Sequence, residues 1–259
     1  MNISFSKYQG TGNDFILIDN REQKIVLTQE QVAFLCHRRF GIGADGLMLL
    51  ENEEGYDFRM VYFNADGSES TMCGNGGRCI TAFARKLGII QNTAHFVAID
   101  GPHDATLHED DTVSLQMQDV TGIQEFDTHS ILNTGSPHYV LWTDNAEGAE
   151  VFATGRNIRN QQEFQPKGIN VNFVQKMDKG GLWVRTYERG VEDETWSCGT
   201  GVTAAAIAAS GSQTGQFTTA IKTPGGNLQV SFTKANSGSA KNVILKGPAV
   251  FVFEGTINL

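Results

Sequence analysis

Two cysteines in this 259-residue chain begin the same short pattern. Cys73 starts the run Cys-Gly-Asn-Gly, and 125 positions later (198 − 73) Cys198 starts Cys-Gly-Thr-Gly. Each is followed by a stretch that favours a helix. A thiol at the start of a helix lies at the positive end of the macrodipole, where cysteine is readily converted to its thiolate. The first backbone N–H groups of such a helix lack partners within it and can bind a carboxylate.

This pattern indicates acid–base chemistry at carbon. If one sulfur is a thiolate and the other a thiol, one removes a proton from a carbon while the other returns one from the opposite face. Such a pair inverts a stereocentre without a cofactor. Nucleophilic catalysis is less favoured, because His138 is the only histidine in a turn-rich motif and cannot serve as base to two cysteines. Hydrogen-bond donors in a dry site must stabilise the developing carbanion.

The composition is that of a globular enzyme with ordinary cores. The chain is 40% hydrophobic and 19% charged, and it is long enough for two domains. Its net charge of −9 and the absence of a Lys/Arg cluster disfavour a nucleic-acid partner. No signal sequence or membrane-spanning apolar run is evident, so we expect a cytoplasmic protein without a membrane partner. Its four scattered cysteines are then expected to be free thiols: Cys36, Cys73, Cys79 and Cys198.

The elements that must position these cysteines are mostly strands. Helices are predicted at Thr28–His37, Gly76–Leu87, Ala153–Asn160 and Val202–Ser210; the last has so little polar surface that it should be buried on most sides. The loop Lys234–Asn242 is predicted to be a solvated hairpin tip. The predicted strands are Ile3–Lys7, Phe15–Asp19, Phe58–Asn64, His95–Ile99, Thr112–Met117, Tyr139–Trp142, Val171–Val174, Leu182–Tyr187, Phe217–Lys222, Asn227–Phe232, Asn242–Lys246 and Val250–Ile257.

The two halves of the chain repeat one another. The strand-forming run Arg59–Asn64 ends nine residues before Cys73 (73 − 64), and the matching run Val184–Arg189 ends nine residues before Cys198 (198 − 189). Asn64 and Arg189 are therefore counterparts in the repeat. The repeat predicts that each half wraps its strands around one central helix.

A second, looser repeat helps to define the domains. Thr11-Gly12-Asn13-Asp14 is echoed by Thr134-Gly135-Ser136-Pro137. We expect an α+β protein of two pseudo-symmetric domains, each a curled, barrel-like mixed β-sheet around a central helix. The predicted domains are residues 1–119 and 120–249, with residues 250–259 packing back onto the first. The active site should lie in the cleft between them.

Across its length the chain resembles the diaminopimelate epimerases, which interconvert LL- and meso-2,6-diaminopimelate in lysine biosynthesis. The resemblance implies an isomerase that needs no cofactor and no metal, acts on a small amino acid and forms a homodimer. The blocks that carry it are Gly10–Phe15, Phe63–Ser68, Met72–Cys79, Asn170–Phe173, Glu188–Gly190 and Ser197–Gly201.

The resemblance also implies roles for single residues. Cys73 and Cys198 would be the two acid/base catalysts. The reacting α-carboxylate would be bound by donors of Gly74, Asn75, Gly199 and Thr200. The far, non-reacting end of the substrate would be held by Asn13, Asn64, Asn170 and Arg189, the last gripping a carboxylate with two hydrogen bonds. Glu188 and His138 would contact the reacting ammonium group and orient the site.

Two positions depart from the family pattern. The family often has Asn where this chain has Ser136, and Gln where it has Gly46; in the family both positions lie at the substrate-binding end. Ser136 retains a hydrogen-bonding side chain and is predicted to be a supporting residue, whereas Gly46 supplies none. A racemase for another amino acid, such as proline, and a non-catalytic amino-acid binder or thiol sensor therefore remain alternatives.

Other features have simpler interpretations. Cys36 and Cys79 lack the glycine-rich repeat context and are predicted to be small buried side chains. The spacing of Cys73 and Cys79, with no second cysteine or histidine pair, disfavours zinc binding. Gly41-Ile42-Gly43 lacks the remaining glycine of a dinucleotide-binding loop.

Overall fold

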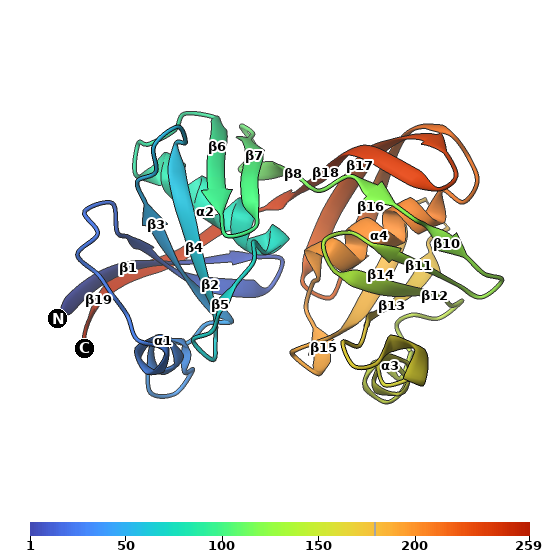
Figure 1. Ribbon diagram of the computed structural model, residues 1–259, viewed down its shortest axis with the longest axis horizontal. Helices are drawn as coiled ribbons and strands as arrows, with labels where there is room; N and C mark the ends of the chain where they lie inside the picture. Colours follow the sequence, from blue (N-terminus) through green and yellow to red (C-terminus); the bar gives the residue numbers. More distant parts are fainter. Residues whose placement is uncertain (179) are drawn as a thin grey trace. The chain divides into compact units, whose positions relative to one another are not determined.

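The computed structural model describes residues 1–178 and 180–259, and its chain forms two compact units. The first unit comprises Met1–Leu115 and Gly247–Leu259, and the second comprises Gln116–Lys246. Each unit has a mixed β-sheet with one helix packed on either side of its central strands (Figure 1).

The sheet of the first unit is antiparallel except at two places. The pairs β2–β3 and β4–β6 are parallel, and short β5 forms a hairpin on the end of β4. The last strand of the chain, β19, pairs with the first, β1. The strands are β1 (Asn2–Gly10), β2 (Asn13–Asp19), β3 (Gly46–Glu51), β4 (Phe58–Asn64), β5 (Glu69–Ser70), β6 (Thr93–Ala98), β7 (Gly101–Leu107), β8 (Thr112–Gln116) and β19 (Val250–Asn258).

Two helices cover opposite faces of this sheet. Helix α1 (Gln29–Cys36) begins with a capping box and buries Val32 and Leu35 against one face of β1, β2 and β3. Helix α2 (Gly74–Lys86) crosses the other face, where Gly76 approaches Met48. Strand β3 is therefore covered on both sides, which explains why its sequence is a continuous apolar run rather than an alternating one.

The second unit repeats this arrangement. Its parallel pairs are β12–β13 and β14–β16, and short β15 pairs with β14 as β5 pairs with β4. The strands are β9 (Val120–Thr121), β10 (Gln124–Glu125), β11 (His129–Asn133), β12 (Pro137–Trp142), β13 (Asn170–Lys176), β14 (Leu182–Glu188), β15 (Asp193–Thr195), β16 (Gly215–Thr223), β17 (Gly226–Asn236) and β18 (Ser239–Pro248).

The helices of the second unit also lie on opposite faces of its sheet. Helix α3 (Val151–Arg159), followed by the short 3-10 helix η1 (Gln162–Phe164), packs against β13 and β14. Helix α4 (Gly199–Ala209) lies against the strands of this sheet (Figure 1) and contacts β11, β12, β13, β14, β16 and β17. The residues from Gly201 to Ala208 are all buried. The prediction that this apolar helix is enclosed by strands is confirmed.

Several element boundaries differ from those predicted. Helices α2 and α4 begin at Gly74 and Gly199, directly after the cysteines, rather than at Gly76 and Val202. Glycine has a low helix propensity, so the sequence pattern placed both starts too late. Strands β3, β7 and β11 and the short strands β5, β9, β10 and β15 were not predicted; β3, for example, lacks the period-two alternation that marks a half-buried strand.

The predicted solvated tip at Lys234–Asn242 is wrong in part. Strand β17 continues to Asn236 and β18 starts at Ser239, so only the two residues between them form the turn. Lys234 is buried, with its ammonium group hydrogen-bonded to the hydroxyl of Ser210 and the carbonyl of Gly211 at the end of α4.

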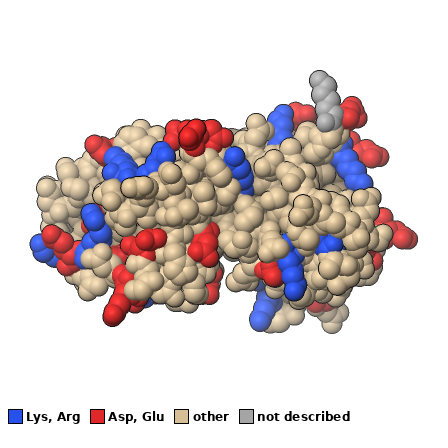
Figure 2. Space-filling model, turned by 90° about the horizontal axis from the view of Figure 1, so that it is seen from above, with Lys and Arg blue, Asp and Glu red and all other residues tan. Residues whose placement is uncertain are grey.

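The surface carries both signs of charge. On the face shown in Figure 2, Lys and Arg side chains are interspersed with Asp and Glu and form no continuous basic area over the described residues. Within residues 1–178 and 180–259, no helix has the length and apolar character needed to cross a membrane.

Candidate active site

Each of the paired cysteines is the N-cap residue of a helix. Cys73 has extended backbone angles (φ −98°, ψ 131°), and the first helical hydrogen bond of α2 runs from the N–H of Gly77 to its carbonyl (2.7 Å). Cys198 caps α4 in the same way (φ −112°, ψ 112°), with the bond donated by Val202 (2.9 Å). The N–H groups of residues 74–76 and 199–201 therefore precede the helical bonds and are directed out of the two N-termini. Each thiol lies beside a potential carboxylate site.

In the first unit, two predicted asparagines lie beside Cys73. The side-chain oxygen of Asn13 is 3.7 Å from the Cys73 sulfur and accepts a hydrogen bond from the amide of Asn75 (3.2 Å). The amide nitrogen of Asn13 donates to a carboxylate oxygen of Asp45 (2.8 Å), a residue that was not predicted to belong to the site. Asn13 is thereby held between Asp45 and the thiol.

Asp45 belongs to a network of charged side chains. The guanidinium of Arg38 binds Asp45 and Asp14 (2.7 Å each), and the ammonium of Lys7 binds Asp14 (2.7 Å). Burial alone would raise the pKa of Asp14, but the hydrogen bonds from Arg38 and Lys7 outweigh it and lower that pKa to about 2. The carboxylate of Asp14 is thereby kept ionised, and that of Asp45 accepts hydrogen bonds from Arg38, from the side chain of Asn13 and from the backbone N–H of Asp14.

Asn64 lies at the end of β4, directly opposite Gly46 in the register of β3 and β4. Its amide donates to the hydroxyl of Ser68 (3.2 Å), and its side chain is partly exposed. The structure therefore places Asn64 and Gly46 side by side on neighbouring strands.

In the second unit, the thiol of Cys198 is connected to three other predicted residues by a series of hydrogen bonds. The Thr200 hydroxyl lies 3.4 Å from the Cys198 sulfur and 3.1 Å from the hydroxyl of Ser136. Ser136 in turn lies 2.9 Å from Nε2 of His138. These four residues form one hydrogen-bonded chain.

Asn170 and Arg189 extend this cluster. Asn170 donates to the hydroxyl of Ser136 and to the carbonyl of Pro137 (3.1 Å each), and its oxygen accepts from the backbone N–H of Arg189 (2.9 Å). The Arg189 guanidinium contacts the carbonyl of Lys167 (3.4 Å).

Glu188 lies at the end of β14 and accepts a hydrogen bond from the hydroxyl of Thr195 on the neighbouring strand β15 (2.9 Å). Within the second unit, all the predicted residues thus lie on the loops and strand ends near the start of α4.

His138 is fully buried and electrically neutral near pH 7. Burial, and then the nearby charge of Arg189, lower the pKa of His138 to about 3. Its Nδ1 lies 3.0 Å from the amide nitrogen of Asn172, a residue that was not predicted to belong to the site. Asn172 follows Asn170 by two residues, so both side chains lie on one face of β13; this period-two spacing was the signal that could have identified it.

Among residues 1–178 and 180–259, the other two cysteines make no such hydrogen bond to a polar side chain. Cys36 and Cys79 are buried in the first unit, and burial raises the pKa of each thiol to about 12. The prediction that both are small buried side chains is confirmed.

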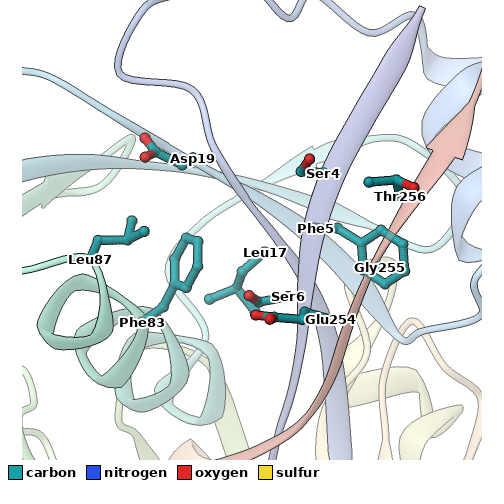
Figure 3. A pocket seen from close by; sticks show the side chains of 10 residues that line it. All are labelled: Ser4, Phe5, Ser6, Leu17, Asp19, Phe83, Leu87, Glu254, Gly255 and Thr256. Atoms are coloured by element: carbon teal, nitrogen blue, oxygen red, sulfur yellow. The ribbon is translucent and has the colours of Figure 1, made fainter.

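One hollow of the surface is separate from the predicted site. It has a volume of about 370 Å³ and lies among β1, β2, β19 and α2, where Phe83 and Leu87 face Leu17 (Figure 3). No predicted site residue lines it.

The family model for diaminopimelate epimerase matches residues 5–123 and 130–252. The chain is 53% identical over 255 residues to the diaminopimelate epimerase of Flavobacterium psychrophilum, covering 97% of this chain and 98% of the relative. It is 42% identical over 260 residues to that of Chlorobaculum tepidum, covering 96% and 99%.

Solved structures show the same fold at low identity. A phenazine biosynthesis protein of the PhzF family from Bacillus anthracis superimposes with a TM-score of 0.81 at 14% identity, over 100% of both chains. A hydroxyproline epimerase from Agrobacterium vitis superimposes with a TM-score of 0.73 at 16% identity, over 100% of this chain and 93% of the other. The predicted class, α+β with curled mixed sheets around central helices, is confirmed. With two curated relatives matched over nearly their whole length and a family model spanning both units, this chain belongs to the diaminopimelate epimerase family.

Proposed function

We propose that this protein interconverts LL- and meso-2,6-diaminopimelate by moving the α-proton between two thiols, as an isomerase of lysine biosynthesis without a cofactor. One observation carries the proposal: Cys73 and Cys198 each cap a helix whose first N–H groups can bind a carboxylate. The names of the relatives support the choice of diaminopimelate.

The chemistry follows from this pairing. The reacting α-carboxylate accepts hydrogen bonds from the N–H groups at the starts of α2 and α4, including those of Gly74, Asn75, Gly199 and Thr200. The thiolate form of one cysteine removes the α-proton, and the thiol of the other delivers a proton to the opposite face of the carbon. The N–H donors stabilise the negative charge that develops on the substrate in between. After one turnover the two sulfurs have exchanged protonation states.

The remaining residues bind the rest of the substrate. Glu188 accepts a hydrogen bond from the reacting ammonium group, and buried His138 orients the site without a charge of its own. The far amino-acid end is bound by the polar side chains of Asn64 and Asn170 and by the guanidinium of Arg189, which presents two parallel donors to a carboxylate. Asn13 is the exception, because its hydrogen bonds to Asn75, Asp45 and Cys73 connect it to the reacting end.

The proposed chemistry needs both thiols reduced. All four cysteines are free, and a reducing cytoplasm would keep them so. We therefore assign the enzyme to the cytoplasm.

We further propose a homodimer that forms through β19. Four consecutive apolar side chains of this strand, Val250 to Phe253, are 43–51% exposed. An exposed run of this kind favours burial against a second copy of the chain. Val252→Asp should convert the dimer to a monomer in analytical ultracentrifugation; a wild-type protein that sediments as a monomer at micromolar concentration would rule the dimer out.

The substrate is tested by product analysis. Reduced protein is incubated separately with LL-2,6-diaminopimelate, L-proline and trans-4-hydroxy-L-proline, and each mixture is resolved by chiral chromatography. We expect meso-diaminopimelate to form and the two proline substrates to remain unchanged. Turnover of a proline substrate alone would favour the racemase alternative, and binding without turnover would favour the non-catalytic one.

A further inference from the structure

The hydrogen bonds at the Nδ1 side of His138 have a fixed donor and acceptor. The amide nitrogen of Asn172 donates to the carbonyl of Tyr139 (3.2 Å), which can only accept, and its oxygen accepts from the hydroxyl of Thr186 (3.0 Å). The same amide nitrogen faces Nδ1 of His138 at 3.0 Å, so this ring nitrogen must be the acceptor. Neutral His138 therefore carries its proton on Nε2.

The donor-to-acceptor order continues from His138 through the hydroxyl of Ser136. Ser136 receives a hydrogen bond from Nε2 of His138 (2.9 Å) and another from the amide of Asn170 (3.1 Å). The Asn170 amide cannot turn round, because its oxygen accepts from the backbone N–H of Arg189 (2.9 Å). The proton of Ser136 is then directed to its remaining partner, the Thr200 hydroxyl, at 3.1 Å.

This series of hydrogen bonds ends at the sulfur of Cys198. Since the Thr200 oxygen accepts the proton of Ser136, its own proton is directed to the Cys198 sulfur at 3.4 Å. A hydrogen bond donated to sulfur stabilises the thiolate relative to the thiol. Asn172, at the far end, sets the direction of every bond in between.

The other thiol has the opposite kind of partner. The carboxylate of Asp45 can only accept, so the amide nitrogen of Asn13 must face it (2.8 Å) and the amide oxygen must face the Cys73 sulfur (3.7 Å). The amide of Asn75 donates to the same oxygen (3.2 Å), which fixes this orientation from a second side. An oxygen acceptor beside sulfur stabilises the thiol and disfavours the thiolate.

We propose that the ligand-free protein holds Cys198 as the thiolate, the proton acceptor, and Cys73 as the thiol, the proton donor. Asp45 and Asn172 are the positioning residues that set this asymmetry. The asymmetry arises at counterpart positions of the sequence repeat. Asn13 directs an oxygen to the Cys73 sulfur, whereas Ser136 donates to the hydroxyl of Thr200, which donates to the Cys198 sulfur. The inference rests on the proposed two-thiol chemistry and specifies which thiol starts the reaction on a free enzyme.

Charged groups near the thiols also affect which of the two is ionised. Arg78 of α2 favours a thiolate at Cys73, but its guanidinium is fully buried and donates to the carbonyls of Gly74 and Pro248 and to the Thr11 hydroxyl. These oxygen dipoles offset part of its charge.

Asp100 acts in the opposite direction to Arg78. Burial disfavours its charge, but hydrogen bonds from His103 and from the N–H of Met72 outweigh that effect and lower the pKa of Asp100. Its carboxylate is thus charged beside the residue that precedes Cys73. In the second unit, the guanidinium of Arg189 acts on the ring of His138 and lowers its pKa, and the carboxylate of Glu188 accepts a hydrogen bond from Thr195.

The assignment is tested by alkylation of each cysteine as a function of pH. Reduced, full-length protein is treated briefly with iodoacetamide from pH 5 to 10, and peptide mass spectrometry gives the rate at each sulfur. The midpoint of each profile reports the thiolate fraction independently of how accessible the sulfur is. Cys198 should show a midpoint at least one pH unit below that of Cys73. Because the thiols can titrate as a coupled pair, each profile is repeated with the other cysteine changed to Ala.

Two pairs of variants test the cause of the asymmetry. Thr200→Val removes the donor and should raise the Cys198 midpoint by about one unit, whereas Thr200→Ser, which keeps the hydroxyl, should leave it within about 0.3 units. In Asp45→Asn the charged guanidinium of Arg38 retains the amide oxygen, so an NH₂ group faces Asn13 and opposes the orientation that Asn75 alone then supports; the Cys73 midpoint should fall by about one unit. Asp14→Asn weakens the same ionic network without contacting the Asn13 side chain and should change that midpoint by less than about 0.3 units.

A double variant tests whether misfolding could explain the shift of the Cys73 midpoint. In Asn13→Asp with Asp45→Asn, donor and acceptor exchange places and a carboxylate oxygen faces Cys73, so its midpoint should rise above that of the wild type. A lower midpoint at Cys73 than at Cys198, or equal shifts in Asp45→Asn and Asp14→Asn, would overturn the proposal. Because alkylation needs no substrate, failure of the diaminopimelate assignment would appear separately in the chromatographic assay.

Discussion

The ring of Tyr62 lies directly over Gly46. A Cβ atom at Gly46 would be 2.6 Å from Cε2 of the Tyr62 ring, 3.1 Å from its hydroxyl oxygen and 2.7 Å from the carbonyl oxygen of Phe63. The same ring meets Phe15 edge-on, with centroids 6.0 Å apart. Asn64 and Phe15 are the register partners of Gly46, so Tyr62 fills the space beside Asn64 where the family often has a Gln side chain.

Restoring that Gln should therefore destabilise this chain. Gly46→Gln overpacks the face between Tyr62 and Phe63, and we expect it to lower the free energy of unfolding by about 2 kcal/mol. Urea denaturation followed by circular dichroism measures the change. Gly238→Gln is the control, since a Cβ there meets only an atom of Asn236 at 3.7 Å. Adding Tyr62→Ala should recover part of the loss; strictly additive costs would show that the ring is not the obstacle.

Gly76 and Gly201 occupy the same position after the two cysteines but should respond differently to Ala. A Cβ at Gly201 would lie 2.3 Å from the side-chain oxygen of Asn172, which is held by hydrogen bonds, whereas a Cβ at Gly76 would meet the flexible methyl end of Met48 at 2.2 Å. Gly201→Ala should cost about 2 kcal/mol of stability and at least tenfold in kcat.

The matched variant Gly76→Ala should stay within about 0.5 kcal/mol of the wild type, because Met48 can turn away and Ala favours the helix. Thermal unfolding and initial rates are measured on both. Equal losses would contradict the proposed importance of the fixed Asn172 amide.

His138 should make the protein sensitive to mild acid. Its pKa of about 3 in the folded protein lies below the ordinary value of 6.5, so the folded state binds fewer protons than the unfolded state between these values. The stabilising contribution is complete above pH 6.5 and is lost as the pH falls toward 3, at a limiting slope of about 1.4 kcal/mol per unit. Asp14, with a pKa of about 2, adds its own loss only below pH 4.

The measurement compares wild type with His138→Asn, whose amide oxygen can still accept from Asn172. Denaturant unfolding at pH 7, 6, 5 and 4 should show the stability difference between the two proteins shrinking with each step. A constant difference would mean that His138 is protonated in the folded state or exposed to solvent.

Lys234 should stabilise the end of α4. Its ammonium group is buried at the helix C-terminus, where carbonyl groups without helical partners attract positive charge. Lys234→Met keeps the apolar stem but leaves those groups without a donor, and it should cost about 1–3 kcal/mol. Exposed Lys241→Met on the next strand should change the stability by less than about 0.5 kcal/mol, and similar values for the two variants would contradict this role.

The sequence was most informative where function imposes a local pattern. The repeated Cys-Gly motifs predicted two helix N-termini, and the apolar run at Val202–Ser210 predicted an enclosed helix; both are present. The glycines of these motifs led to helix starts that were predicted too late. Glycine has a low helix propensity, but tertiary packing stabilises the helix at these positions nevertheless. The burial of Lys234 could not be predicted either, since its partner carbonyl comes from an element 23 residues away.

Side-chain relationships across strands were also hidden from the sequence. Asp45 contacts Asn13 from 32 positions away, and Tyr62 covers Gly46 through strand register rather than through any local motif. Such contacts depend on which strands pair and in which register, and a period-two pattern leaves both open. The role of Asn172 could have been predicted from the sequence, because its side chain lies on the same face of β13 as that of Asn170.

The most direct test of the two-thiol account is proton NMR in D₂O. Reduced wild-type protein is mixed with LL-2,6-diaminopimelate and the α-proton signal is followed, in parallel with Cys73→Ala and Cys198→Ala. The account predicts that the wild type replaces the α-proton with deuterium as the meso isomer appears, and that each variant stays folded but forms no meso isomer. Near-wild-type epimerisation by either variant, or no exchange by wild-type protein whose thiols are shown to be free, would contradict it.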